Sequence, residues 1–350
     1  MRITLLILFI CFGSILKSQS DFSYFYNQGQ EKFVNGNFNE AATAFSSALK
    51  NKYSAKNDYA IANAYKARSF CKMELGNFSA AIADISDAIK LKPEFSELYL
   101  ARTIIHLRAK QYDESIKWAN EGLLLKPEYE DLILMKVKAK ISKKMYVEAL
   151  NDADTLLKIN PLNIEAWNMK GSALQRQKNY PGAAEAFSKT ILIDPQNIAA
   201  FYDRGISYAH MKDFEKALVD INRGMEIDSS ERWIGYNNIA YFVKFEQKDY
   251  QGAIELFDKA IKLNPTFAYA YCNRGYAKIQ LNDLKGARKD ITKSLELYSG
   301  NSYAYKTFAQ LLLAEKKQQE ACVKLKKAID LGYTEEYDDE VITLMKENCK

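Results

Sequence analysis

The chain has 350 residues, of which 27% are charged and 48% are hydrophobic, and its 49 basic and 44 acidic residues give a formal net charge of +5. Both signs are interspersed along the chain, so it lacks the basic stripe that binding to a phosphate backbone requires. This pattern excludes nucleic acid as the expected partner.

The first twenty residues have the order of an export signal. Arg2 is followed by a mostly apolar stretch from Ile3 to Leu16, and Lys17 leads into a short segment of small and polar residues. A basic start, an apolar core and small residues at the end are typical of a secretory signal peptide. A retained membrane anchor is the alternative, but the core is shorter than the ~20 residues that a span needs. We therefore expect residues 1–20 to be removed, leaving a periplasmic, envelope-associated or secreted protein without a membrane span.

A small residue returns at a nearly fixed spacing through the rest of the chain, at Ala41, Ala81, Ser115, Ala149, Ala183, Ala217, Ala253, Ala287 and Ala321. Six of the eight intervals are 34 residues, and the other two are 40 and 36. An aromatic residue usually stands three positions earlier, and small or apolar residues follow four and seven positions later. These spacings mark one face of an α-helix. The fixed period predicts a stacked array of helical repeats.

Two helices are predicted in each repeat. Asn or Asp precedes the second helix in six repeats and suits its N-cap, at Asn37, Asn77, Asn179, Asp213, Asp249 and Asp283. Proline ends that helix in five repeats, at Pro93, Pro127, Pro161, Pro195 and Pro265. We place an array of nine units at 21–335 and a capping helix at 336–350.

Segments 168–195 and 271–297 resemble the tetratricopeptide repeat family most clearly, and the likeness covers nearly all of the chain after residue 20. The glycine that is typical of the first helix is present in four repeats and is replaced by Thr103, Val137 and Tyr241 in three others. The resemblance implies an all-α fold, an α-solenoid in which about nine helix-turn-helix repeats form a right-handed superhelix. It also implies a protein-binding scaffold, here of the exported bacterial type, whose first helices line a concave groove.

The sequence offers little catalytic chemistry. His106 and His210 stand in no zinc-ligand spacing, and the chain has no Cys-x-x-Cys pair, phosphate-binding glycine loop or nucleophile elbow. We interpret the histidines as structural or solvated, and carboxylates such as Asp84 and Asp152 as solvated charges on helix surfaces. No catalytic residue, metal or cofactor is expected, and the chain is predicted not to be an enzyme.

Function is therefore expected in the groove that the resemblance implies. Its lining positions in repeats six to nine hold Tyr202, Asp203, Asn238, Phe242, Phe245, Tyr269, Asn273, Tyr276, Tyr303 and Lys306. Exposed aromatic side chains supply contact area and amides hold a peptide backbone, so we interpret this set as a binding site for a peptide or protein segment. For each residue the alternative is packing between neighbouring first helices. Two other functions remain open, a structural subunit of an envelope complex that uses its convex face or ends, and an accessory subunit of an enzyme.

Four cysteines follow the predicted signal peptide. Cys71 and Cys272 lie in first helices of distant repeats, and we interpret them as buried small hydrophobic residues. Cys322 opens the last second helix and Cys349 closes the cap. The C-terminal pattern from Ala321-Cys322 to Cys349 resembles the ends of similar tetratricopeptide proteins, which implies a disulfide between these two residues. Export would favour the bond, but two free thiols remain the alternative.

Overall fold

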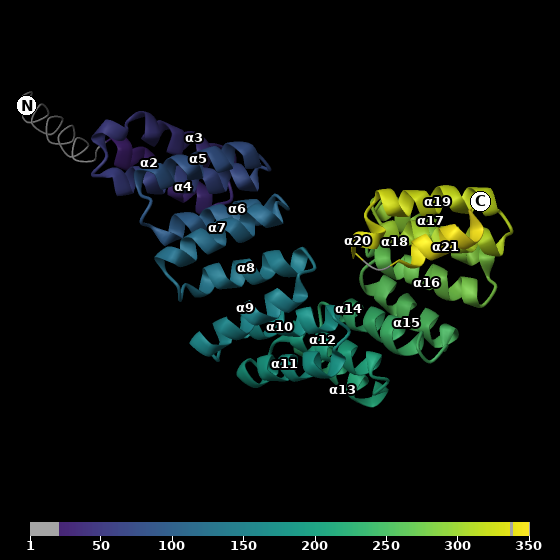
Figure 1. The fold of residues 1–350 in the computed structure, drawn as a ribbon. Helices are drawn as coiled ribbons and strands as arrows, with labels where there is room; N and C mark the ends of the chain where they lie inside the picture. Colours follow the sequence, from purple (N-terminus) through teal and green to yellow (C-terminus); the bar gives the residue numbers. More distant parts are fainter. Residues whose placement is uncertain (1–20, 337–338, 350) are drawn as a thin grey trace, which may run out of the picture. The chain divides into compact units, whose positions relative to one another are not determined.

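The structure is a computed structural model that describes residues 21–336 and 339–349 (Figure 1). The predicted signal peptide lies outside the described residues. Helices joined by short turns make up the described chain, which confirms the all-α class. The chain divides into two compact units, one up to Gln177 and one from Lys178 onward, and the boundary falls between the two helices of the fifth repeat.

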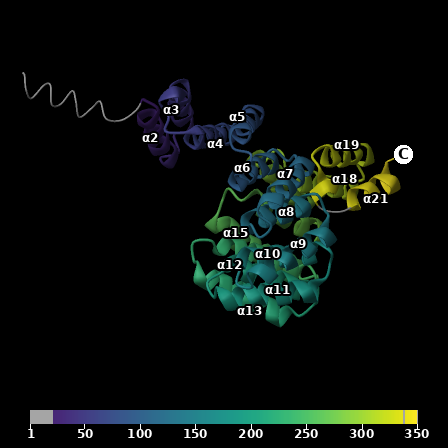
Figure 2. The same ribbon diagram turned by 60° about the vertical axis from the view of Figure 1, so that its left-hand side comes forward.

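In unit 1 each first helix except the last packs against the second helix that follows it, and the last one packs against the second helix before it (Figure 2). Its helices are α2 (Asp21–Val34), α3 (Phe38–Lys50), the short 3-10 helix η1 (Lys52–Ser54), α4 (Asp58–Glu74), α5 (Phe78–Leu91), α6 (Ser96–Arg108), α7 (Tyr112–Leu125), α8 (Glu130–Ser142), α9 (Tyr146–Ile159) and α10 (Ile164–Arg176).

Unit 2 continues the same alternation and ends in the C-terminal cap. Its helices are α11 (Tyr180–Ile193), α12 (Ile198–His210), α13 (Phe214–Ile227), α14 (Arg232–Asn238), the π-helix η2 (Ile239–Lys244), α15 (Tyr250–Leu263), α16 (Ala268–Gln280), α17 (Leu284–Leu297), α18 (Ser302–Ala314), α19 (Gln318–Asp330), α20 (Tyr333–Glu336) and α21 (Glu340–Asn348).

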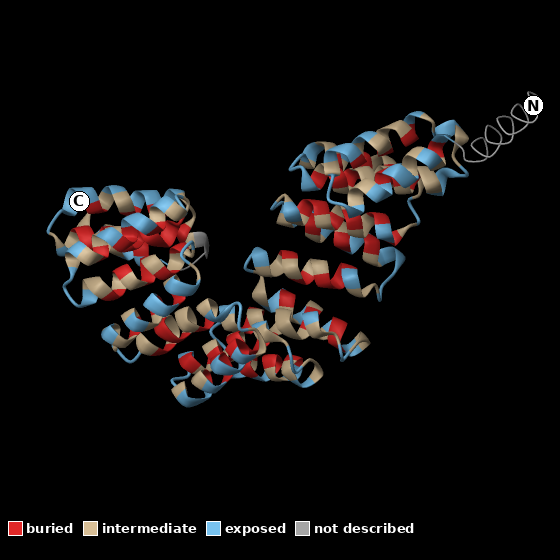
Figure 3. Ribbon diagram, turned by 180° about the vertical axis from the view of Figure 1, so that it is seen from behind, coloured by how far each residue is buried: buried red, intermediate tan, exposed pale blue. Residues whose placement is uncertain are grey.

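The periodic small residue marks the interface within each helix pair. All nine of these residues are 0% exposed, and Figure 3 shows buried residues, in red, recurring along the helices. The contact is tight, because a Cβ atom added to Gly205 would lie 2.8 Å from Ile221 Cγ1 and 3.1 Å from the carbonyl oxygen of Ala217. The repeating pattern therefore reflects helix packing, because small side chains let the two helices approach closely.

The turn between the two helices has the same backbone geometry in every repeat. Five positions before each small residue, φ is positive, between 57° and 76°, at Gly36, Gly76, Lys110, Lys144, Lys178, Lys212, Lys248, Asn282 and Lys316. The turns close with hydrogen bonds of the Schellman type, such as that from the Asn77 N–H to the Lys72 carbonyl, 2.8 Å. The next residue begins the second helix. Five of the six predicted N-cap side chains accept a backbone hydrogen bond there, and Asn37 does not.

The C-terminal cap differs from the single helix predicted at 336–350. It comprises two helices, α20 and α21, and α21 packs on α19. A disulfide bond joins Cys322 at the start of α19 to Cys349 just after α21. Cys71 and Cys272 are free thiols that are both 0% exposed, and burial raises the pKa of these thiols to about 11 and about 12. They are therefore inert hydrophobic core residues, as predicted.

Candidate functional site

The first helix of the seventh repeat is widened into the π-helix η2. This repeat follows the 36-residue interval, and the Phe245 N–H donates to the Ala240 carbonyl at 3.2 Å, five residues back. Ala240 is 0% exposed and packs against Ala253 and Phe257, where other repeats place the glycine of the first helix. The alignment of Tyr241 with that glycine was therefore wrong, because the wider turn moves the buried position back by one residue.

Tyr241 instead joins a continuous row of rings in unit 2, which begins on α11, follows the first helices of the next repeats and ends on α20 of the cap. We call this row the aromatic strip: Tyr180, His210, Tyr241, Phe242, Phe245, Tyr276, Tyr303 and Tyr333. Successive ring centroids lie 4.4 Å apart for Tyr180–His210, 5.6 Å for His210–Phe242, 4.9 Å for Tyr241–Phe242, 5.5 Å for Tyr241–Phe245, 5.3 Å for Phe245–Tyr276, 6.3 Å for Tyr241–Tyr303 and 6.5 Å for Tyr303–Tyr333. All of these separations are close enough for favourable ring contacts.

One contact in the aromatic strip shows that this face is locally concave. Tyr241 and Tyr303 belong to first helices two repeats apart, yet their rings meet over α16. Packed helix axes are about 8–10 Å apart, so helices two steps apart in a flat layer would be separated by roughly twice that distance. The rings meet because their side chains converge, as side chains on the inner side of a curved layer do.

The ten residues predicted to line the groove are more buried than expected. Tyr202, Asn273, Tyr303 and Lys306 are buried, and the other six are half-buried, so none is exposed. The expectation of exposed aromatic side chains was wrong, because rings on neighbouring first helices pack against one another. Half-buried rings of Phe242, Phe245 and Tyr276 still present part of their surface to solvent.

The structure divides the predicted set into several environments. Phe242, Phe245, Tyr276 and Tyr303 lie in the aromatic strip, with Lys306 Nζ 4.6 Å from the Tyr303 ring centre. The remaining residues of the set lie elsewhere.

Tyr202 belongs to the core, because a Cβ atom added to Gly224 would lie 2.6 Å from its ring. Asn273 donates to the Asn237 side chain at 3.1 Å, and Tyr269 lies against Phe267 and Tyr298 in a separate group of rings. Asn238 ends α14. Asp203 is half-buried on α12, and burial raises the pKa of its carboxyl to about 6. Tyr202 and Asn273 therefore have packing roles, and none of the five residues is a member of the aromatic strip.

Four members of the aromatic strip were missed by the sequence analysis: Tyr180, His210, Tyr241 and Tyr333. Tyr180 is the aromatic residue three positions before the small residue of its repeat, and His210 was interpreted as structural or solvated. His210 is exposed, as a solvated residue would be, but its ring also stacks on Tyr180 and meets the Phe242 ring edge-on. Partial desolvation lowers the pKa of the imidazole. The two additional residues in the seventh repeat were the available signal for Tyr241.

Buried ion pairs recur between the first and second helices of three repeats. Arg68 binds Asp84, Arg204 binds Asp220 and Arg274 binds Asp290, each through two nitrogen–oxygen contacts of 2.6–2.8 Å. These carboxylates are 3%, 4% and 2% exposed. The interpretation of Asp84 as a solvated charge was therefore wrong. Asp152 likewise binds Lys136 and Lys140 from the first helix of its repeat. Each of these carboxylates pairs with a cation on the first helix of its repeat and has a structural role.

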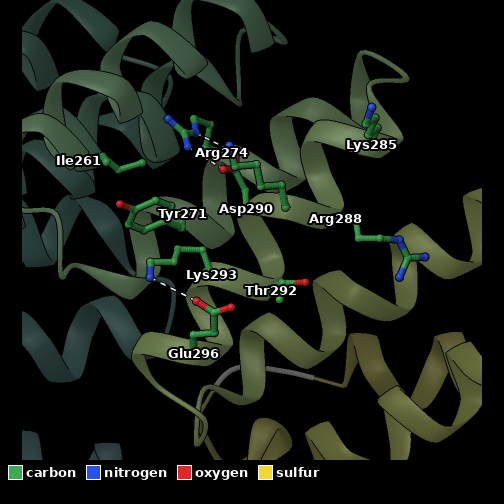
Figure 4. A pocket seen from close by; sticks show the side chains of 10 residues that line it. Ile261, Tyr271, Arg274, Lys285, Arg288, Asp290, Thr292, Lys293 and Glu296 are labelled. Atoms are coloured by element: carbon green, nitrogen blue, oxygen red, sulfur yellow. Dashed lines mark hydrogen bonds and ion pairs between the residues drawn. The ribbon is translucent and has the colours of Figure 1, made fainter.

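A shallow hollow lies over α15, α16 and α17 (Figure 4). It encloses about 690 Å³, and its lining includes Arg274 and four basic residues of α17: Lys285, Arg288, Lys289 and Lys293. Three of these five cations are already paired, Arg274 with Asp290, Arg288 with Glu315 and Lys293 with Glu296. The hollow is therefore a mostly neutralised surface and is not a built anion site.

The described residues contain no group of three or more His, Cys, Asp or Glu side chains that could hold a metal ion. Within the same part of the chain, no helix is both long and apolar enough to cross a membrane.

Family models match several stretches of the chain. Models described as tetratricopeptide repeat match residues 72–130, 146–198 and 268–301, and one described as TPR repeat matches 243–282. The chain is a tetratricopeptide repeat protein. Members of this family are scaffolds for protein–protein interaction and are generally non-enzymatic.

Two solved structures share this fold. A tetratricopeptide repeat protein from Parabacteroides merdae has a TM-score of 0.57 at 17% identity, over 81% of this chain and 98% of that chain. A chain of the APC/C hetero-tetramer Cut9–Hcn1 has a TM-score of 0.53 at 14% identity, over 94% of this chain and 76% of that chain. These likenesses show the fold alone.

RNA polymerase II-associated protein 3 from Xenopus tropicalis is 32% identical over 126 residues. The match covers 36% of this chain and 19% of that protein, so this tetratricopeptide repeat protein spans less than a fifth of its relative's length.

Proposed function

We propose that this tetratricopeptide repeat protein is an exported scaffold that binds a segment of a partner protein along the aromatic strip of unit 2. The observation that carries the proposal is the strip itself, a continuous row of rings that is locally concave where Tyr241 meets Tyr303. Aromatic anchors dominate the energetics of protein interfaces, and π-helical turns occur frequently at functional sites.

The packing of the strip favours binding to a partner. Each half-buried ring is held by its neighbours, as Phe245 is by Tyr241, Tyr250 and Tyr276. Such side chains have already lost most of their rotamer freedom, so little further entropy is lost when a partner covers them. The aromatic strip is therefore preorganised for an extended peptide or a helix with apolar side chains along one side.

A structural subunit of an envelope complex is the second candidate function. The hollow over α17 supports it, because its lining comes largely from a second helix and includes Lys285 and Lys289. An accessory subunit of an enzyme remains a further alternative, for which no residue of the described chain supplies a specific argument.

The binding site is tested by a matched pair of double variants. Phe242→Ala with Tyr276→Ala should lower affinity for a partner crosslinked from an envelope extract and then purified, by at least about thirty-fold, the equivalent of ~2 kcal/mol for interface anchors. The control, Glu255→Ala with Lys259→Ala, changes two exposed side chains on α15 and should have little effect. Circular dichroism establishes folding. If the folded aromatic variant binds normally while the control fails, the partner binds elsewhere.

Export is tested separately by the intact mass of the protein from its native host. The order of charge and apolarity in residues 1–20 motivates cleavage between Ser18 and Asp21. We expect a mass that lacks about the first twenty residues. A mature protein that still begins at Met1 would contradict signal cleavage.

A further inference from the structure

We propose that the surface of α18 and α19 beneath α21 is a binding site for the acidic, amphipathic helix of a partner, and that the Cys322–Cys349 disulfide closes it. In this structure α21 of the same chain occupies the surface. The inference rests on the proposed function, because the covered surface includes Tyr303 and Tyr276 of the aromatic strip, and it names the partner class and the control of access.

Lys306 is the centre of the covered surface. Its side chain is only 4% exposed, and its Nζ lies 3.0 Å from Glu340 Oε2, at the first residue of α21. The same amine lies 4.6 Å from the ring centre of Tyr303 and 5.7 Å from that of Tyr276. A cation held in this way needs a carboxylate, because water reaches it poorly.

The Glu340 carboxylate receives two further hydrogen bonds. Gln310 Nε2 donates to Oε1 at 3.2 Å, and the Tyr333 hydroxyl donates to Oε2 at 3.4 Å. Three donors from α18 and α20 thus converge on one carboxylate at the start of a helix. This geometry is specific for an acidic residue in the first turn of the docked helix.

The rest of the docked face is apolar. Val341, the residue after Glu340, is 0% exposed in one cluster with Tyr303, Leu312 and Tyr333. Leu344 and Met345 of the same helix pack against this cluster. The occupant therefore shows what the surface accepts: a helix with an acidic first turn and apolar residues one, four and five positions after the acid.

The disulfide holds α21 in place at its far end. The helix has nine residues, and so short a helix is marginal in water without packing. Cys349 follows its last turn and is bonded to Cys322 of α19, while Gln318 Nε2 donates to the Asn348 carbonyl at 2.7 Å. Because both sulfur atoms lie in half-buried residues, a dithiol has access to the bond.

Reduction converts this covalent attachment into a reversible one. A dithiol reductant donates two electrons and two protons to the disulfide, so Cys322 and Cys349 become thiols and the reductant becomes a disulfide. The C-terminal end of α21 is then held by non-covalent contacts alone, and a partner helix competes for Lys306. The disulfide-bonded chain keeps the site closed.

The test uses a fluorescent peptide with the sequence of residues 339–349, in which serine replaces the cysteine. Fluorescence anisotropy measures its binding to the full mature chain in the disulfide-bonded form, after reduction by dithiothreitol, and in the Cys322→Ser, Cys349→Ser variant. We expect the latter two to bind at least tenfold more tightly than the disulfide-bonded chain. Equal affinity in all three forms would overturn the proposal.

Two substitutions in the cysteine-free variant test the site itself. Lys306→Met should abolish peptide binding, whereas Lys289→Met on the outer side of α17 should leave it unchanged. A peptide with Glu340→Gln should bind more weakly than its parent to both the parent chain and the Lys289→Met chain. Binding that survives Lys306→Met in a folded chain would contradict the assignment.

Hydrogen exchange supplies a measurement that needs no variant. Amide protection in α21 should fall on reduction of the wild-type chain while protection in α16 and α17 is unchanged. If α21 stays equally protected, the disulfide does not control the site. Loss of partner capture on Phe242→Ala with Tyr276→Ala, together with failure of the peptide to bind, would leave the proposed function standing without this inference.

Discussion

Replacing Asp290 by alanine should lower the free energy of unfolding by about 3–5 kcal/mol, the usual cost of removing one partner of a buried ion pair. The Asp290 carboxylate is 2% exposed and accepts hydrogen bonds from Arg274 Nε and Nη2 and from Lys278 Nζ, at 2.8, 2.6 and 2.8 Å. Without it, two largely buried cations on α16 lose their shared counter-charge. Thermal unfolding followed by circular dichroism measures the loss.

Asp258 provides the matched control for this change. It binds the same Arg274 but is 54% exposed, so Asp258→Ala should cost less than about 1 kcal/mol. Equal losses in the two variants would mean that burial of the carboxylate does not set its contribution, contrary to the role assigned to the buried pairs.

Replacing Ala287 by phenylalanine is the second change with a large expected effect. Ala287 is 0% exposed, and a Cβ atom added to Gly275 of the facing helix would lie 3.3 Å from its carbonyl oxygen. The added ring has no space between α16 and α17, so we expect a loss of roughly 3 kcal/mol, at the upper end for overpacked cores.

Lys289→Phe adds a similar ring two residues away on the exposed side of α17 and should change stability by less than about 0.5 kcal/mol. Chemical denaturation of both variants, with hydrogen exchange to locate the weakened helices, compares the two positions. An unchanged midpoint for Ala287→Phe would show that the small residue is not the point of closest approach.

The sequence predicted the structure correctly where one type of residue has the same role in every repeat. The buried small residues and most of the Asn and Asp N-caps are local features, so their spacing along the chain predicted their positions. The seventh repeat was misaligned because a π-helical turn shifts the buried positions of the helix along the sequence. The residue types in the helix do not change with this shift, so their periodic pattern does not reveal it. Only the interval of 36 residues, in place of the usual 34, indicated the two additional residues in this repeat.

The environment of the predicted site was harder to predict than its position. Asp84 was interpreted as solvated because its partner, Arg68, lies on another helix sixteen residues earlier. The same spacing recurs for Arg204 with Asp220, so it was a usable signal. The exposure of the predicted groove residues depends on how strongly the side chains of neighbouring helices converge. The spacing of residues along the sequence does not predict this convergence.

The left-handed residues in the turns have a consequence for the whole molecule. Seven of these positions hold Lys or Asn, with φ between 57° and 62°. A side chain with a Cβ atom in this conformation costs on the order of 1 kcal/mol relative to glycine. Since the stability of a repeat array is close to a sum over its units, the cost accumulates from one turn to the next. This protein therefore works below the stability that its architecture permits, and the reserve is distributed over the turns of the whole array.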